Sequence, residues 1–199
     1  MKLYKFYSAS SKYTLVNILN NQLYFAKPSE FNDPLDSYLK IIENETNKVV
    51  FDLRQNSLRV LCLTAEISEY MWKRYADNGN GFCLEYDSED ICKNPEDIKK
   101  VVYMPETEIY NTLKAGVRKY ELSECRDKST GLCLILIAYM YKRTKYKEEK
   151  EYRALSKCKT KNVVPKRIII GDKVKNPVKK EIKQHCSMNN IECVLEKSK

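Results

Sequence analysis

Two glutamates and an arginine alternate along one short stretch, and their spacing raises the first chemical question. Glu149, Glu151 and Arg153 stand two residues apart in KYKEEKEYRAL (145–155). Side chains two residues apart share one face of a β-strand, so a strand over 149–155 would bring these three groups together. Two carboxylates on one face repel unless a cation or a polar substrate group lies between them. The candidates for this cation are Arg153 and, from the end of the preceding helix, Lys142 or Arg143.

Two interpretations of this stretch remain open on spacing alone. It fits an exposed ladder of ion pairs, because runs of surface charge are common and have no function. It also fits a site in which Glu151 and Glu149 are catalytic while Arg153 and Lys142 bind the substrate. A carboxylate beside a ribose stabilises the positive charge that develops when a glycosidic bond breaks.

Several other kinds of site lack their sequence signatures. Neither GxGxxG nor GxxxxGK occurs, so no common glycine-rich phosphate loop is present. Eight cysteines without a CxxC pair and a single histidine argue against a zinc site or a disulfide framework. A metal-dependent nuclease is the second enzymatic hypothesis, and it would use Asp33, Asp36, Glu149 and Glu151. The preferred hypothesis expects no metal.

Charge is distributed unevenly along the chain. The net charge is +9, and the excess of Lys and Arg lies in residues 101–199, mostly between positions 142 and 183. A basic face favours phosphate-bearing partners such as RNA, DNA or a dinucleotide, although a lysine-rich proteome would also give this composition. A non-catalytic nucleic-acid-binding module using the basic segment 142–183 is therefore the competing class of function.

The chain is predicted to be one domain, residues 1–199, in the cytoplasm. Its 199 residues, 43% of them apolar, suffice for one core, and no repeat or linker is evident. The N-terminus lacks the apolar segment of a signal peptide, and the apolar run LCLILIAYM (132–140) is too short to span a bilayer. We expect no membrane partner, and the oligomeric state stays open.

The elements that must position the candidate residues alternate irregularly between strands and helices. This order predicts the α+β class, with a mixed, mostly antiparallel sheet flanked by helices. Strands are expected over 3–8, 23–28, 59–64, 81–86, 99–104, 149–155, 167–171 and 191–197. Helices are expected over 8–21, 36–56, 68–81, 106–142 as a broken pair, and 176–190.

Two further segments add candidate residues. In FNDP (31–34), Asn32 and Asp33 form a turn that we expect to lie near the Glu149 strand. In MWKRYADNGNG (71–81), helical spacing puts Trp72 and Tyr75 on one aromatic face. That face suits either the core or a platform for a ligand.

These pieces together resemble a known family, the bacterial domain-of-unknown-function family 2971. The resemblance runs from Leu3 to about Gly171, which leaves a strand–helix–strand extension over about 167–197. It includes Glu149, Glu151 and Arg153, and this favours a functional site over a surface ladder. In that block the family usually carries an aromatic residue, commonly Trp, where this chain has Tyr146. The most specific matches are Phe31–Pro34, Met71-Trp72 with Tyr75-Ala76, Gly81–Cys83 and the block 142–153.

The layout more distantly resembles the mono-ADP-ribosyltransferase-like fold. That resemblance implies NAD as a substrate, contacted by Tyr4 and Lys5 of the first strand, with Tyr24 or Trp72 stacked on nicotinamide. Lys5 stands where such enzymes usually carry Arg or His. The function expected is a nucleotide-handling enzyme that transfers ADP-ribose from NAD or hydrolyses NAD, in a toxin, phage-defence or stress setting.

Overall fold

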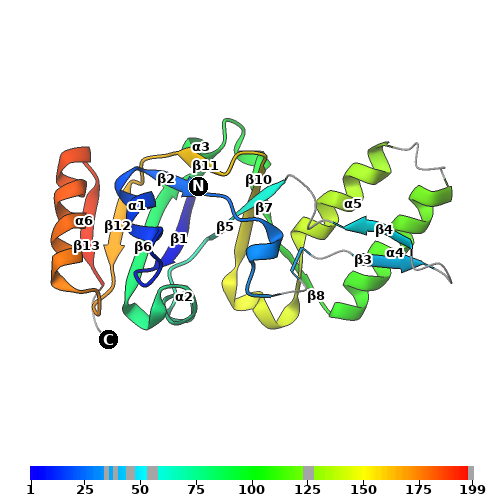
Figure 1. Ribbon diagram of the computed structural model, residues 1–199, viewed down its shortest axis with the longest axis horizontal. Helices are drawn as coiled ribbons and strands as arrows, with labels where there is room; N and C mark the ends of the chain where they lie inside the picture. The colour runs from blue at the N-terminus through cyan, green and yellow to red at the C-terminus, as the bar shows by residue number, and fades with distance from the viewer. Residues whose placement is uncertain (34–35, 38–39, 44–47, 53–57, 123–127, 197–199) are drawn as a thin grey trace.

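The molecule is elongated, with helices at both ends of a central sheet (Figure 1). The computed structural model describes residues 1–33, 36–37, 40–43, 48–52, 58–122 and 128–196. Helix α6 (Asn176–Asn189) lies at one end, and the pair α4 (Glu106–Leu122) and α5 (Lys128–Met140) lies at the other. In the described part of the chain, no helix is long and apolar enough to cross a membrane.

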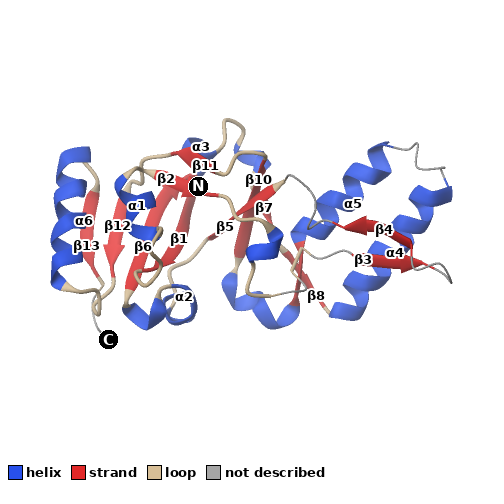
Figure 2. Ribbon diagram, viewed as in Figure 1, coloured by secondary structure: helices blue, strands red, loops and turns tan. Residues whose placement is uncertain are grey.

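The main sheet is mostly antiparallel, as predicted. Within the described residues it has the strand order β13-β12-β6-β1-β5-β10-β7, and only β12 and β13 are parallel neighbours. The α+β class is therefore confirmed (Figure 2). The strands are β1 (Lys2–Ser8), β5 (Arg59–Thr64), β6 (Gly81–Asp87), β7 (Lys99–Lys100), β10 (Glu151–Ser156), β12 (Arg167–Ile170) and β13 (Glu192–Leu195).

Smaller elements surround this sheet. Antiparallel pairs join β2 (Gln22–Tyr24) to β11 (Thr160–Asn162) and β3 (Lys40–Glu43) to β4 (Lys48–Asp52). A parallel pair joins β8 (Val102–Met104) to β9 (Tyr141–Arg143). The remaining helices are α1 (Thr14–Leu19), α2 (Glu69–Tyr75) and α3 (Ser88–Ile91), with 3-10 turns η1 (Pro28–Glu30), η3 (Asp77–Gly79), η4 (Pro95–Asp97) and η5 (Thr144–Glu149).

Two predicted elements were wrong. The helix expected over 36–56 is replaced, in its described part, by the antiparallel strands β3 and β4. Runs of β-branched residues, Ile41-Ile42 and Val49-Val50, favour strands over helix. The single strand expected over 99–104 is instead two strands, since β7 pairs with β10 and β8 pairs with β9.

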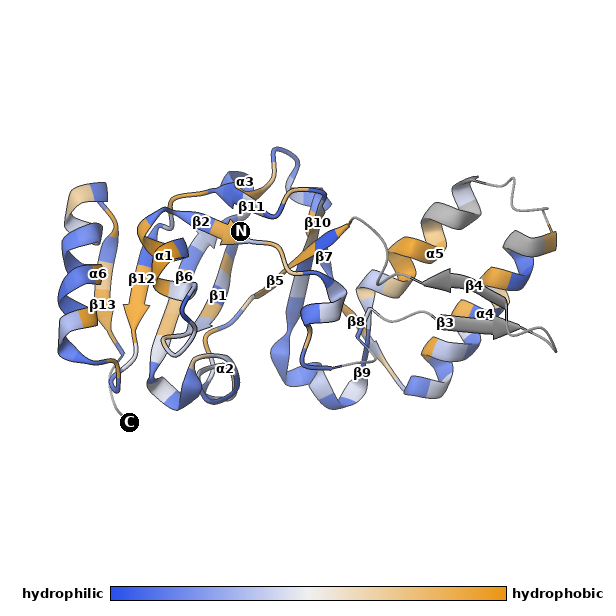
Figure 3. Ribbon diagram, in the orientation of Figure 1, coloured by the Kyte–Doolittle hydropathy of each residue, from blue (hydrophilic) through white to orange (hydrophobic). Residues whose placement is uncertain are grey.

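The two faces of the sheet have different environments. On one face, alternate residues of β1, β5 and β10 such as Leu3, Leu61 and Ala154 belong to the largest core cluster. On the other face, two separate apolar clusters form, one around Phe6 and Trp72 of α2 and one joining Val60 to α4 and α5. Figure 3 shows the apolar character of α5, which explains why it is buried against this second cluster.

Candidate functional site

Strand β10 carries the floor of the candidate site on the face that bears the two smaller clusters. Its register places Glu151 opposite Thr64 and Arg153 opposite Cys62 of β5. Tyr152 packs against the largest core on the other face, as alternation predicts. Glu151 is 3% exposed and Arg153 is 0% exposed. These charges are therefore not an exposed ladder.

Glu149 reaches the same place by a different route from the one expected. It ends the 3-10 turn η5 rather than lying in the strand, which begins at Glu151. Between them, Lys150 has a left-handed conformation with φ of +43°, a conformation that costs free energy in a residue with a side chain. The turn brings the carboxylate of Glu149 beside that of Glu151, with Lys142 contacting both.

Arg153 is enclosed by acceptors from the protein. It donates to both oxygens of Asp36 at 2.8 and 2.7 Å and to both oxygens of Glu151 at 2.7 and 3.0 Å. Further bonds reach Ser37 Oγ at 3.0 Å and the carbonyl of Tyr139 at 2.7 Å. Because Arg153 is fully buried and its donors are taken up by these acceptors, its geometry fits the positioning of Glu151 rather than the substrate contact that we expected.

A cavity of about 180 Å³ lies over this floor and borders both smaller clusters. Its wall includes aromatic side chains from β1, the FNDP turn, α2 and η5. Burial raises the pKa of the Cys62 thiol, which lines the cavity, to about 12, so this thiol is not a ready nucleophile. The cavity lining includes Tyr4, Lys5, Phe6, Phe31, Asn32, Asp33, Asp36, Arg74, Tyr75, Lys142, Tyr146, Glu149 and Glu151.

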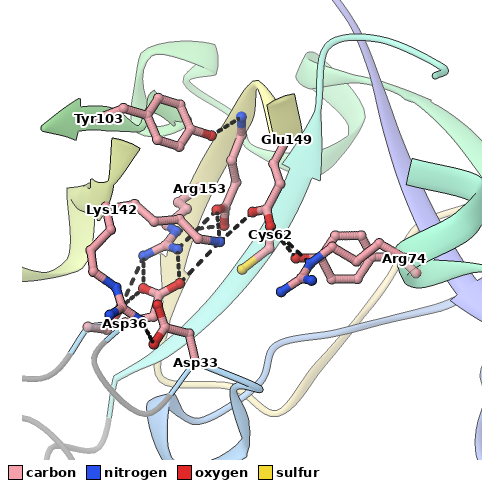
Figure 4. A network of polar contacts seen from close by, with 12 residues as sticks. Asp33, Asp36, Cys62, Arg74, Tyr103, Lys142, Glu149 and Arg153 are labelled. Atoms are coloured by element: carbon pink, nitrogen blue, oxygen red, sulfur yellow. Dashed lines mark hydrogen bonds and ion pairs between the residues drawn. The ribbon is translucent and has the colours of Figure 1, made fainter. Parts of the chain in front are cut away.

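Lys142 lies among three carboxylates (Figure 4). Its Nζ is 2.8 Å from Glu151 Oε2 and 3.2 Å from Asp36 Oδ2, and it also donates to Glu149 Oε2. Burial disfavours the ammonium, but the charges of Glu151 and Asp36 raise its pKa well above the ordinary range. Lys142 is therefore a fixed cation, in the position where a divalent metal would otherwise contact these carboxylates.

The two glutamates have pKa shifts of opposite direction. Burial raises the pKa of Glu149, although Lys142 and the hydroxyl of Tyr75, which donates to Oε1 at 2.6 Å, partly offset this. Burial alone would also raise the pKa of Glu151, but the charges of Arg153 and Lys142 hold it well below its usual range. One carboxylate therefore stays ionised while its neighbour can hold a proton, a pattern typical of acid–base pairs.

Most of the residues singled out from the sequence meet at this cavity. Tyr4, Lys5, Asn32, Asp33, Tyr75, Lys142, Glu149 and Glu151 all line it. The FNDP turn is held there because Arg143 donates to the buried Asp33 and, at 3.1 Å, to Glu106. The expected proximity of this turn to Glu149 is present.

Two candidates for stacking on nicotinamide lie away from the cavity lining. Trp72 packs edge-on against Phe6, with ring centroids 5.2 Å apart, and is 7% exposed. The hydroxyl of Tyr24 donates to Glu30 at 2.6 Å, and its ring lies under Lys159. Trp72 is thus a core residue, the alternative that helical spacing had left open.

Several residues of the site were missed. Asp36 was considered only as a metal ligand, yet it pairs with Arg153 and Lys142. Arg74 and Tyr146 were not selected, although both fall within segments that resemble the family. The sequence signal that could have identified Tyr146 was the aromatic residue that the family usually carries at this position.

The lysines of the basic segment 142–183 have different environments. Lys142 is buried, Lys150 pairs with Glu66 at 2.6 Å, and Lys166 pairs with Asp90 at 3.0 Å. Such pairing reduces the charge available to a nucleic acid at these positions. Binding of nucleic acid by this segment stays a prediction.

Comparison with known proteins finds one family model, and its description names no activity. Residues 71–154 match the family model described as "Protein of unknown function (DUF2971)". The match covers β6, η5, all but the start of α2 and all but the end of β10, and it includes Arg74, Tyr75, Lys142, Glu149 and Glu151. Neither the curated proteins nor the solved structures gave a match for this chain.

Proposed function

We propose a function from the site, because the description of the family model that residues 71–154 match names no activity. The proposed reaction is cleavage of the nicotinamide–ribose bond of NAD. The ADP-ribosyl group is transferred to an acceptor or to water. The observation that carries this proposal is the pair of buried glutamates with opposite pKa shifts at one cavity. This arrangement suits a reaction that develops positive charge on a ribose.

Each glutamate has a distinct part in the proposed reaction. Glu151, kept ionised by Arg153, stabilises the oxocarbenium-like ribose as the bond to nicotinamide breaks. Glu149, with its raised pKa, binds a ribose hydroxyl and takes the proton of the acceptor. Tyr75 and Lys142 fix the orientation of Glu149.

The size of the cavity bears on how NAD would lie. Sites that enclose a drug-sized ligand are typically about 300–1,000 Å³, and this cavity is about 180 Å³. It suits the nicotinamide-riboside end of NAD, with Tyr4 and Phe31 available for contact with the nicotinamide ring. The remainder of the molecule would extend beyond the mouth.

The geometry favours this reaction over a metal-dependent nuclease. Among the described residues, no group of three or more His, Cys, Asp or Glu side chains is arranged to hold a metal. The ammonium of Lys142 occupies the space between Glu149, Glu151 and Asp36. A divalent ion would have to displace this buried cation, at the cost of the contacts that it makes.

The test is release of nicotinamide from NAD by the purified chain. Glu151→Gln keeps the shape and removes the charge, so kcat should fall about 100-fold or more. Glu148→Gln is the matched control, because Glu148 is an exposed glutamate three residues before Glu151. Wild-type protein that releases no nicotinamide, with water and with a range of protein and nucleic-acid acceptors, would overturn the proposal.

A chelator separates the two enzymatic hypotheses. NAD cleavage should be unaffected by EDTA, since no step uses a metal. Nucleic-acid cleavage that disappears with EDTA and returns with Mg²⁺ or Mn²⁺ would instead support the nuclease.

A further inference from the structure

The ring of Tyr146 is surrounded by cations at the cavity. Arg74 Cζ lies 5.2 Å, Lys142 Nζ 5.1 Å, Arg143 Cζ 5.7 Å and Lys145 Nζ 4.9 Å from its centroid. Each distance is within the range of a cation–π contact. Like charges gathered around one ring repel one another, so the cluster needs negative charge from elsewhere.

Two of the four cations have strong partners within the protein. Lys142 contacts three carboxylates, and Arg143 pairs with Asp33 and Glu106. Their charges are therefore already compensated.

The positive charges of Arg74 and Lys145 are compensated less well by carboxylates of the protein. The carboxylate partner of Arg74, among the described residues, is Glu149, through a contact of 3.5 Å that uses Nε. A guanidinium has five N–H donors, so this contact leaves donors for a ligand. The side chain of Arg74 is 37% exposed. Lys145 is exposed, and no described carboxylate lies within ion-pair distance of it.

Arg74 is held in place by aromatic rings. It lies in the last turn of helix α2, where its guanidinium lies over the Tyr75 ring at 5.7 Å as well as over Tyr146. Figure 4 shows the guanidinium of Arg74 turned toward Glu149. A guanidinium held between rings loses less conformational entropy when it binds a ligand.

We propose that Arg74 and Lys145, with Tyr146 between them, form a subsite for the diphosphate of a nucleotide at the cavity mouth. Arg74 supplies forked hydrogen bonds to phosphate oxygens, and Lys145 supplies a point charge. The cavity holds only part of a dinucleotide, and Arg74 and Tyr146 line it, so the diphosphate leaves the cavity beside them. The identity of the nucleotide as NAD rests on the proposed function, whereas recognition of a diphosphate does not.

Calorimetry on the full chain tests the subsite with pyrophosphate, ADP and ADP-ribose as probes and adenosine as the uncharged reference. The three phosphate compounds should bind, and Arg74→Gln should weaken each about 10- to 100-fold, the range for a lost hydrogen bond to a charged group. Lys145→Gln should weaken them by a smaller factor. Adenosine should bind far more weakly than ADP, with an affinity that neither change alters.

Lys73→Gln and Lys147→Gln are matched controls, because each removes an exposed cation next to a subsite residue. Arg74→Lys should restore only part of the affinity, since the charge returns without the fork. Thermal unfolding of each variant guards against loss of the fold. Pyrophosphate that fails to bind, or that binds equally to wild-type chain and both Gln variants at positions 74 and 145, would overturn the subsite.

The outcomes for the subsite and for the proposed function are distinguishable. Arg74-dependent binding of ADP-ribose by a chain that releases no nicotinamide would support the subsite and refute NAD cleavage. NAD cleavage with a KM unchanged by Arg74→Gln and Lys145→Gln would refute the subsite and leave the proposed function standing.

Discussion

Arg153 and Asp36 are joined by two parallel hydrogen bonds, Nη1 to Oδ1 at 2.8 Å and Nη2 to Oδ2 at 2.7 Å, and both side chains are buried. The contact fixes the segment after the FNDP turn against strand β10, 117 residues further along the chain. Asp36 also contacts Lys142 at 3.2 Å. The floor of the cavity is thus one network of buried charges.

Removal of Arg153 should severely destabilise the fold. Arg153→Ala leaves Asp36 and Glu151 buried without their main partner, and such changes cost about 3–5 kcal/mol. Urea unfolding measures the loss. Lys150→Ala is the control, because its pair with Glu66 is half exposed and should cost less than about 1 kcal/mol. Equal stability of the two variants would mean that the buried network contributes little.

The two glutamates should give opposite dependences of stability on pH. The pKa of Glu149 in the fold is above the ordinary value of 4.5, so the folded state holds the proton more tightly. Its contribution to the free energy of unfolding should fall as pH rises from about 4.5 through the raised pKa. Glu151 has a lowered pKa, so its contribution is present above about 4.5 and is lost as pH falls below that value.

Urea unfolding between about pH 3 and pH 8 checks this, with the wild-type chain compared with Glu149→Gln and with Glu151→Gln. The two differences in stability should slope in opposite directions. Parallel slopes would contradict the assignment of opposite shifts.

The hydroxyl of Tyr75 should set the pH at which Glu149 loses its proton. Its bond to Oε1 favours the carboxylate, so Tyr75→Phe should raise the pKa of Glu149 further. The acidic limb of the kcat profile for NAD cleavage should then move to higher pH. Tyr110→Phe is the control, since Tyr110 is 56% exposed on α4. A lower kcat at every pH, with the acidic limb at an unchanged pH, would assign Tyr75 to substrate contact instead.

Trp72 should affect stability and not binding. It packs against Phe6 outside the cavity, so Trp72→Ala should cost about 3–5 kcal/mol in unfolding free energy. The affinity of the variant for ADP-ribose, measured where it remains folded, should stay within about twofold of wild type. A large loss of affinity with retained stability would restore Trp72 as a ligand platform.

The basic segment 142–183 gives a prediction that is independent of catalysis. If it binds RNA or duplex DNA, the logarithm of the affinity should fall with the logarithm of salt concentration by about 0.9 for each neutralised phosphate. Electrophoretic mobility shifts over a salt series measure this slope. Absence of binding at about 50 mM salt would remove the binding-module hypothesis.

Local patterns in the sequence were sufficient for most of the sheet and its helices. Alternating and β-branched runs predicted β1, β5, β6 and β12, and helical spacing predicted α2 and α6. The helix expected over 36–56 was wrong in its described part, because the β-branched pairs of that segment favour strands. The strands β9 and β11 have three residues each, too short for periodicity to be visible.

For the site, spacing placed Glu151 and Arg153 on one strand face but could not separate their roles. A 3-10 turn and the left-handed Lys150 bring in Glu149, and neither has a periodic signature. Arg153 is fully buried beneath the cavity, whereas Arg74 lines the cavity with a side chain that is 37% exposed, although both are arginines within the same family match. Exposure, not residue type, decides which of them can contact a ligand.

The sequence by itself determined the α+β class, the strand that carries Glu151, and the candidate set of charged residues, because these follow from interactions between near neighbours in the chain. Only the tertiary structure decided which charges pair. Asp36, Lys142 and Arg153 meet through strand pairing and turn geometry across more than 100 residues. Burial then acts on that arrangement, raising the pKa of one glutamate and leaving the other ionised beside its cations.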